Sequence, residues 1–231
     1  MVCPGRRGSR GARQRGHHVP CVPAPGIATQ KKSLHASERD TPRVQHARQD
    51  YRQKIAALDL RRLKFVDESG VNLAMTRLYG RAPAGQRVVG SVPQNYGPNV
   101  TMLGALGVYG LQAVMTVDGA TDTAVFRTYV KQVLGPTLRP GDIVVMDNLQ
   151  AHKAVGVQQA IARRGARLLY RPPYSPDLSP IEPCWSKVKT ALRKAKARTR
   201  GALDTAMAEV MLTVSLTDAW GWFKHCGYPL Q

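Results

Sequence analysis

Acidic residues are scarce in this chain. Its 231 residues include 15 Asp or Glu against 34 Lys or Arg, for a formal net charge of +19. The excess of positive charge is present in the first 60 residues and in the remainder alike. A protein this basic favours a polyanionic partner, and nucleic acid is the commonest one. The few carboxylates therefore need an explanation other than solubility.

Cysteine is also rare. There is no CxxC pair, and four cysteines are too few for a disulfide-stabilised scaffold. Reduced thiols, as in a cytoplasmic protein, are the simplest interpretation. A zinc site is the alternative that remains open, although the spacing does not favour it, and it would use Cys3, His17, His18 and Cys21.

Long apolar segments are missing as well. No secretory apolar region follows the N-terminus, and the Arg-rich, acid-free residues 1–37 contain too much Gly and Pro for the amphipathic helix of a transit peptide. Residues 100–117 form an uncharged run, but Gly104, Gly107 and Gly110 interrupt it. Two buried strands joined by a tight turn fit this run better than a membrane span.

The chain divides into two parts by composition. Residues 1–60 are predicted to be a disordered basic segment with one short helix near 44–60, and not a complete DNA-binding domain. Residues 61–231 are predicted to be a packed domain. Its expected strands are 63–68, 100–108, 111–117, 142–147 and 167–170, and its expected helices are 122–134, 152–164, 180–197, 201–215 and 217–225. This order predicts an α/β fold with helices on both faces of a sheet.

Three of the scarce acids occupy special positions. Asp67 and Asp147 each follow a buried strand, and Glu182 lies at the start of a helix. Sites in α/β sheets form beyond the strand ends, and three carboxylates there would bind Mg²⁺ or Mn²⁺. Each acid also has a structural alternative. Asp is favoured in turns, and Ser179-x-x-Glu182 reads as a capping box.

The helix that begins near Glu182 has two stripes. An apolar one, expected to face the sheet, comprises Ile181, Trp185, Val188, Leu192 and Ala195. A basic one on the Glu182 flank is the candidate track for a phosphate backbone, although any solvated face of a basic protein carries such residues. It comprises Lys189, Arg193, Lys196 and Arg200.

Three motifs together resemble one family. They are Asp67-Glu68-Ser69, Met146-Asp147-Asn148-x-x-x-His152, and the segment PPYSPDLSPIE over residues 172–182, and 34 residues separate Asp147 from Glu182. In this order and at this interval they resemble the mariner-like bacterial insertion-sequence transposases of the DDE superfamily. The resemblance covers about residues 60–230.

The resemblance implies a ribonuclease H-like mixed sheet flanked by helices, with Asp67, Asp147 and Glu182 as a catalytic triad that holds two Mg²⁺ or Mn²⁺ ions. The implied reaction is DNA strand cleavage followed by strand transfer. The implied partners are double-stranded DNA, both transposon ends and target, and a second copy of the chain. Neither a nucleotide cofactor nor a membrane is expected. The implied location is the cytoplasm, on the nucleoid when DNA is bound.

Secondary roles follow for residues near the triad. Glu68 is expected to point to the opposite side of its strand and stays outside the triad. The remaining expectations are that Asn148 orients Asp147, that His152 contacts substrate or caps a helix, that Asp177 braces its loop through an Asx turn, and that Arg171 and Tyr174 contact DNA.

Two departures from the family pattern stand out. Ser179 replaces the usual Asn, which we expect to be mild because both residues cap helices well. Relatives also carry helix-turn-helix units ahead of the catalytic domain, and residues 1–60 do not match them, so a truncated copy is expected. The alternative functions are an inactive DNA-binding remnant and a ribonuclease H-like nuclease with another substrate.

Overall fold

The computed structural model describes residues 34–149 and 151–228. The disorder and the zinc alternative predicted for residues 1–33 therefore lie outside the described residues. One compact unit begins at His35 and contains every helix and strand discussed below.

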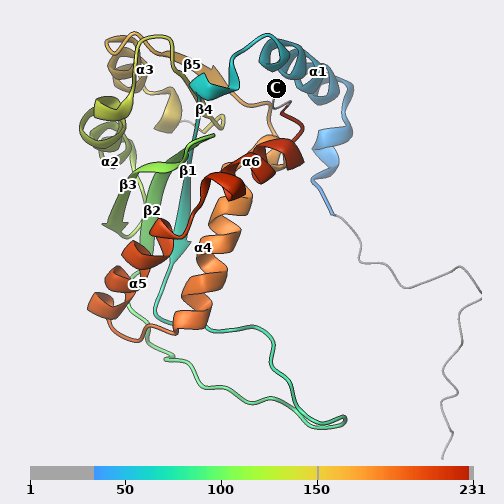
Figure 1. Ribbon diagram of the computed structural model, residues 1–231, viewed down its shortest axis with the longest axis vertical. Coiled ribbons are helices and arrows are strands. Elements are labelled where there is room, and N and C mark those ends of the chain that lie inside the picture. Colours follow the sequence, from blue (N-terminus) through green and yellow to red (C-terminus); the bar gives the residue numbers. More distant parts are fainter. Residues whose placement is uncertain (1–33, 150, 229–231) are drawn as a thin grey trace, which may run out of the picture. The chain divides into compact units, whose positions relative to one another are not determined.

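A five-stranded mixed sheet forms the centre of this unit (Figure 1). Its strand order is β3-β2-β1-β4-β5. The first three strands along the chain pair antiparallel, whereas β1, β4 and β5 pair parallel. This is the ribonuclease H-like mixed sheet that the sequence predicted. The strands are β1 (Leu63–Val71), β2 (Val100–Gly107), β3 (Gly110–Asp118), β4 (Ile143–Met146) and β5 (Arg167–Tyr170).

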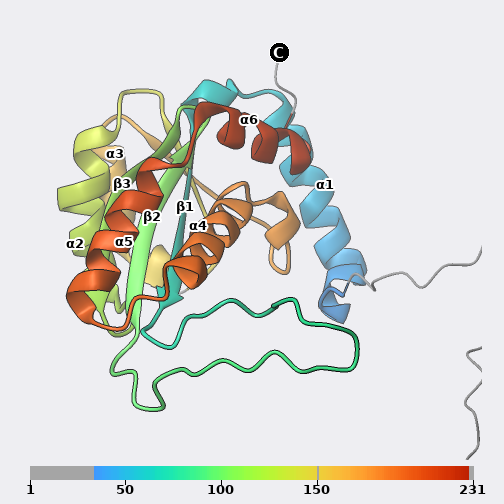
Figure 2. The ribbon, with the colours of Figure 1, turned by 60° about the horizontal axis from the view of Figure 1, so that its bottom comes forward.

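Helices cover both faces of the sheet, as predicted (Figures 1 and 2). Alternate residues of β1 enter separate cores, with Phe65 on one side and Val66 on the other. The Phe65 core is closed by α1 (Pro42–Ala56), α4 (Ile181–Ala195), α5 (Arg200–Leu212) and α6 (Leu216–His225). The Val66 core is closed by α2 (Thr123–Thr128), the π-helical segment η3 (Tyr129–Leu134) and α3 (Val155–Ala162).

Short 3-10 turns join these elements. Those next to the strand ends matter most here, because η5 (Ala151–Lys153) carries His152 and η6 (Pro176–Leu178) carries Asp177. The predicted helix at 152–164 is therefore split, with His152 in the turn that precedes α3. The other turns are η1 (Ser37–Asp40), η2 (Leu60–Arg62) and η4 (Gly135–Thr137).

The β2–β3 hairpin confirms the strand interpretation of residues 100–117. Gly110 is the first residue of β3 and has a φ of 105°, a backbone conformation that residues other than glycine rarely adopt. Within the described residues, no helix has both the length and the apolar character that crossing a membrane requires. Between β1 and β2, residues 72–99 run far out from the sheet without a helix or strand (Figure 2).

Helix α1 corrects the predicted boundary at residue 60. Its buried residues are Val44, Arg48, Tyr51 and Ile55, and the last two belong to the same core as Phe65. Their spacing of 4, 3 and 4 residues is that of a helix packed along one side. The segment from 42 to 56 is thus an integral part of the compact unit and not part of a separate basic segment.

Both ends of α4 also differ from the prediction. The helix starts at Ile181 without a side-chain cap, so the Ser179–Glu182 capping box does not form, and the Ser179 hydroxyl is buried without a hydrogen-bond partner. The substitution of the family's Asn therefore does not act through capping. At the other end α4 stops at Ala195, because Lys196 adopts a left-handed conformation with φ of 53°.

Candidate active site

Three charged residues stand side by side where the parallel pairing stops, with Asp67 inside β1, which continues to Val71, and with Asp147 and Arg171 directly after β4 and β5. β1 and β4 pair up to Phe65 and Val145, so the same register continued by two residues sets Asp67 opposite Asp147. β4 and β5 pair up to Met146 and Tyr170, and the next backbone hydrogen bond joins the Arg171 N–H to the Met146 carbonyl. The order across the sheet is therefore Asp67, Asp147, Arg171.

Glu182 comes to this row from α4. It is the second residue of the helix, and its side chain is exposed. Asp147 and Glu182 line one cavity of about 310 Å³ together with the whole loop from Arg171 to Pro176. Asp67 does not line this cavity, but it is electrostatically coupled to both of the other acids. The tertiary structure thus brings together the three carboxylates that the sequence singled out.

The charge state of Asp67 reflects this crowding. Burial, followed by the negative charge of Glu182, raises the pKa of Asp67 to about 7, and Asp147 adds to the effect. The positive charge of Arg171 acts in the opposite direction. A carboxylate beside two others loses free energy unless a cation balances the group.

Asp147 has a cation of its own. The His152 Nδ1 lies 2.5 Å from the Asp147 Oδ1, and its Nε2 lies 3.5 Å from the Glu68 Oε1. Burial lowers the pKa of His152, but the hydrogen bonds with Asp147 and Glu68 outweigh it and raise that pKa to about 9. Burial raises the pKa of Asp147, and the hydrogen bond and charge of His152 reverse this and lower it.

The contacts of His152 with Asp147 and Glu68 change two of the predictions made from the sequence. His152 is packed against Phe126, with ring centroids 4.2 Å apart, and contacts Asp147 instead of a helix end. Glu68, which we expected to point to the opposite side of its strand from Asp67, contacts the same histidine as Asp147. Asn148 is exposed, and no hydrogen bond among the described residues joins it to Asp147. The orienting role predicted for Asn148 belongs to His152 and to the Leu149 N–H, which donates to the Asp147 Oδ1 over 3.1 Å.

In the loop from Arg171 to Leu178, the two predicted DNA contacts differ in their exposure to solvent. Arg171 is only 7% exposed, so it acts on the carboxylates and offers DNA little surface. Tyr174 is exposed in the cavity wall and has φ of 53°, a left-handed conformation that is strained for a tyrosine. Of the two predicted DNA contacts in this loop, Tyr174 alone has the exposure that the role requires.

The basic row on α4 is shorter than predicted. Lys189 and Arg193 lie on the helix and are half-buried, whereas Lys196 lies beyond its last residue. Arg200 begins α5 and pairs with Asp204 and with Asp118. A helical projection from Glu182 therefore fails for Arg200, because the chain turns between the two helices.

The sequence interpretation missed Arg48. Its guanidinium is 2% exposed and pairs with Asp177 across 129 residues, where we expected only a local Asx turn. The helical spacing of Val44, Tyr51 and Ile55 contains the signal, because Arg48 occupies a core position in that apolar series.

Across residues 34–149 and 151–228, no group of three His, Cys, Asp or Glu side chains is arranged closely enough to hold a metal ion. The thiols of this region, Cys184 and Cys226, are buried and free.

Comparison with solved structures supports the fold. The chain superposes on Mos1 transposase in the paired-end complex with left transposon end at a TM-score of 0.70 and 15% identity, covering 87% of this chain and 64% of that chain. The catalytic domain of Mos1 mariner transposase gives a TM-score of 0.62 and 15% identity, with coverage of 85% and 92%. The chain thus spans less than two thirds of the longer Mos1 chain.

Sequence comparison defines the family. No curated protein matches the chain. The family described as DDE superfamily endonuclease matches residues 62–204, which is more than half of the sequence and includes Asp67, Asp147 and Glu182. With the ribonuclease H-like sheet and this match, the chain belongs to the DDE superfamily endonuclease family.

Proposed function

We propose that this chain is a transposase catalytic domain that carries out metal-dependent DNA cleavage and strand transfer through Asp67, Asp147 and Glu182. The observation that carries the proposal is their convergence, since the strand register sets Asp67 opposite Asp147 and one cavity is lined by both Asp147 and Glu182. Each comes from a different element, which a set of local turn formers would not require.

The chemistry of these donors fits hard divalent cations. Carboxylate oxygens are the preferred ligands of Mg²⁺ and Mn²⁺, and the unbalanced negative charge around Asp67 is what such cations would offset. Asp67, Asp147 and Glu182 would hold two ions once their side chains move closer together, because as they stand no three such side chains of the described region are grouped tightly enough. When bound, the ions would activate the attacking hydroxyl and stabilise the leaving oxygen of the phosphodiester.

The chain's own residues supply the rest. His152 holds the carboxylate of Asp147 in one orientation, and Arg171 places a fixed positive charge next to it in the strand row. Tyr174 is exposed beside the cavity, Lys189 and Arg193 lead away from Glu182 along α4, and Lys196 lies just past the end of that helix. We propose these four as contacts to the DNA backbone and bases.

Similar structures support this proposal by analogy. Mos1 transposase has been solved as a paired-end complex with left transposon end, and as paired-end complexes with Mn and with Mg. By extension we propose that two copies of this chain act together on paired DNA ends.

The test is a nicking assay on supercoiled plasmid with Mn²⁺ or Mg²⁺, followed by strand-transfer assays on labelled duplexes. We expect wild-type protein to nick DNA and Asp147→Asn to lose about a thousandfold in rate. Asp204→Asn is the matched control, because it removes the same charge from an exposed site on α5. It should retain wild-type activity.

The outcomes separate the candidates. Equal rates for wild type and Asp147→Asn would refute the proposed chemistry. Salt-dependent DNA binding without any cleavage would favour the binding remnant. Cleavage of RNA–DNA hybrids in preference to DNA duplexes would favour a different nuclease.

A further inference from the structure

We propose that Arg48, on a helix outside the family-matched segment, is a positioning residue that holds the active-site loop and thereby Glu182 in its working place. The inference rests on the proposed function, because it assigns Arg48 a part in that reaction. The family match begins at residue 62, so α1 is not included in it. The contacts of α1 nevertheless lead directly to the cavity wall.

The first contact is a set of three hydrogen bonds from Arg48 to the loop, two of which go to the carboxylate of Asp177. From the guanidinium of Arg48, Nη1 donates to the Ser175 Oγ over 2.7 Å and to the Asp177 Oδ1 over 3.0 Å, and Nη2 donates to the Asp177 Oδ2 over 2.7 Å. A planar guanidinium that binds a carboxylate with two parallel bonds fixes direction as well as distance. Arg48 is buried, so water has little access to its guanidinium, although the Asp177 carboxylate is 39% exposed.

The second contact is a hydrogen bond between two residues of the loop. The Ser175 hydroxyl that accepts from Arg48 donates to the Pro173 carbonyl over 2.9 Å. Between these two residues lies Tyr174 in its left-handed conformation, which costs free energy unless the surroundings impose it. Arg48 is thus one of two buried guanidinium groups on the strained turn in the cavity wall, and the other, Arg171, donates to the Ser175 carbonyl over 3.5 Å.

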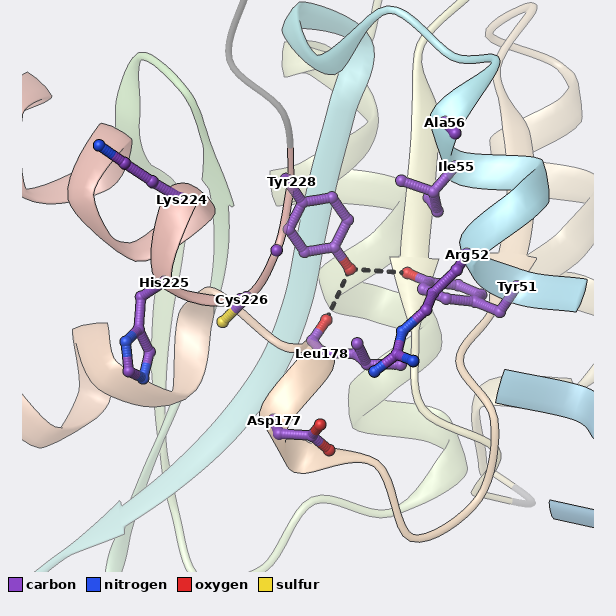
Figure 3. Close-up of a pocket in the computed structure, with 11 residues that line it drawn as sticks. Tyr51, Arg52, Ile55, Ala56, Asp177, Leu178, Lys224, His225, Cys226 and Tyr228 are labelled. Atoms are coloured by element: carbon purple, nitrogen blue, oxygen red, sulfur yellow. Dashed lines mark hydrogen bonds between the residues drawn. The ribbon is translucent and has the colours of Figure 1, made fainter. Parts of the chain in front are cut away.

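A third contact from α1 reaches the far end of the loop (Figure 3). The Tyr228 hydroxyl donates to the Leu178 carbonyl over 2.7 Å, and the Tyr51 hydroxyl lies 3.0 Å from that of Tyr228. A hydroxyl has one proton, so Tyr51 is the donor to Tyr228. Arg48 and Tyr51 lie three residues apart on α1 and therefore secure the loop at two points.

Glu182 depends on this arrangement. The loop leads through Ser179 and Pro180 into α4, whose N-terminus has no side-chain cap. Glu182 is exposed, and no hydrogen bond of its side chain is present among the described residues to hold it. The position of its carboxylate therefore depends on the position of the first turn of α4, which the preceding loop sets.

The experiment compares Arg48→Met with Arg43→Met. Arg43 is exposed on the same helix, so the control removes the same charge without touching the loop. With saturating DNA and Mg²⁺, we expect Arg48→Met to lower kcat by about tenfold to a hundredfold while its Kd for DNA matches that of Arg43→Met. Arg48→Lys, which keeps the charge but loses the fork, should have an intermediate kcat.

Two further readouts do not depend on turnover. Binding of Mn²⁺ alone, followed by electron paramagnetic resonance, should weaken about tenfold in Arg48→Met and remain unchanged in Arg43→Met. Amide hydrogen exchange of residues 174–178 should accelerate in Arg48→Met only. If Arg48→Met does not fold, Ser175→Ala replaces it, because this change removes one acceptor and keeps the Arg48–Asp177 pair.

The two proposals fail in different ways. If wild-type protein neither binds Mn²⁺ nor nicks DNA, the proposed function is refuted, and with it any role of Arg48 in catalysis. If wild type is active but the Arg48 and Arg43 variants agree within about twofold in kcat, Mn²⁺ affinity and loop exchange, Arg48 has no positioning role. A parallel loss of DNA affinity and kcat would likewise overturn it, since that pattern indicates general loosening.

Discussion

Asp147 and Glu182 are held in opposite ways. Asp147 directly follows a buried strand, and His152, five residues away, lies beside its carboxylate and also contacts Glu68 of the neighbouring strand. Among the described residues the Glu182 side chain has no hydrogen bond or ion pair, and its loop is secured by a helix more than a hundred residues earlier in the chain. A carboxylate on a strand end needs only its neighbours, whereas one on a helix that follows an irregular loop needs distant support.

The largest expected effect is on the Glu182 side. Asp177→Ala leaves the guanidinium of Arg48 buried without its carboxylate, so we expect a loss of about 2–4 kcal/mol in the free energy of unfolding. The loss should stay below the extreme for buried pairs, because Asp177 itself is 39% exposed. Urea denaturation measures it. Asp204→Ala, which breaks an exposed i,i+4 pair, should cost no more than about 0.5 kcal/mol.

On the Asp147 side, His152→Ala should cost about 1–3 kcal/mol. The change removes the ion pair and leaves a gap against Phe126. Glu68→Gln should cost less than about 1 kcal/mol, because its contact with His152 is long at 3.5 Å and Glu68 is partly exposed. A cost for Glu68→Gln as large as that for His152→Ala would mean that Glu68 is a primary support of Asp147.

A pH titration can isolate the Arg48–Asp177 pair. The hydrogen bond and charge of Arg48, with Arg39 adding its charge, hold the pKa of Asp177 below its ordinary value. A lowered pKa means that the stabilisation is complete above about pH 4 and is lost as the pH falls through the folded-state pKa. The difference in unfolding free energy between wild type and Asp177→Asn should therefore shrink in acid. A difference that is constant from neutral pH to about pH 2 would contradict the charge-based account.

The smallest effects are expected along α4. Lys189→Gln should reduce the salt dependence of DNA binding by about one unit of the log–log slope, as for one lost phosphate contact. Arg200→Gln should leave the slope nearly unchanged, because Arg200 already pairs with Asp118 and Asp204. Fluorescence anisotropy at several salt concentrations measures both. Equal slopes for the two variants would mean that the acidic partners do not withhold Arg200 from DNA.

Much of the fold could be predicted from the sequence. Buried runs such as Ile143–Met146 and the glycine-interrupted run from 100 to 117 have local periods that strands and hairpins impose, and both formed as expected. The boundaries were less predictable. Lys196 ends α4 through its backbone conformation, and no residue type marks that position as a breaker. A helix near 44–60 was predicted where α1 forms, but its packing into the Phe65 core was missed, because its apolar series contains an arginine.

The sequence by itself singled out three acids. Asp67 and Asp147 come directly after short apolar runs, Glu182 lies at the start of an amphipathic helix, and these are local patterns that can be read along the chain. Only the tertiary structure decided what holds them. Arg48 is one of 34 basic residues, and nothing near it in the chain identifies Asp177 as its partner. Burial selects one guanidinium from many, because an unpaired charge inside the protein would cost too much free energy to persist.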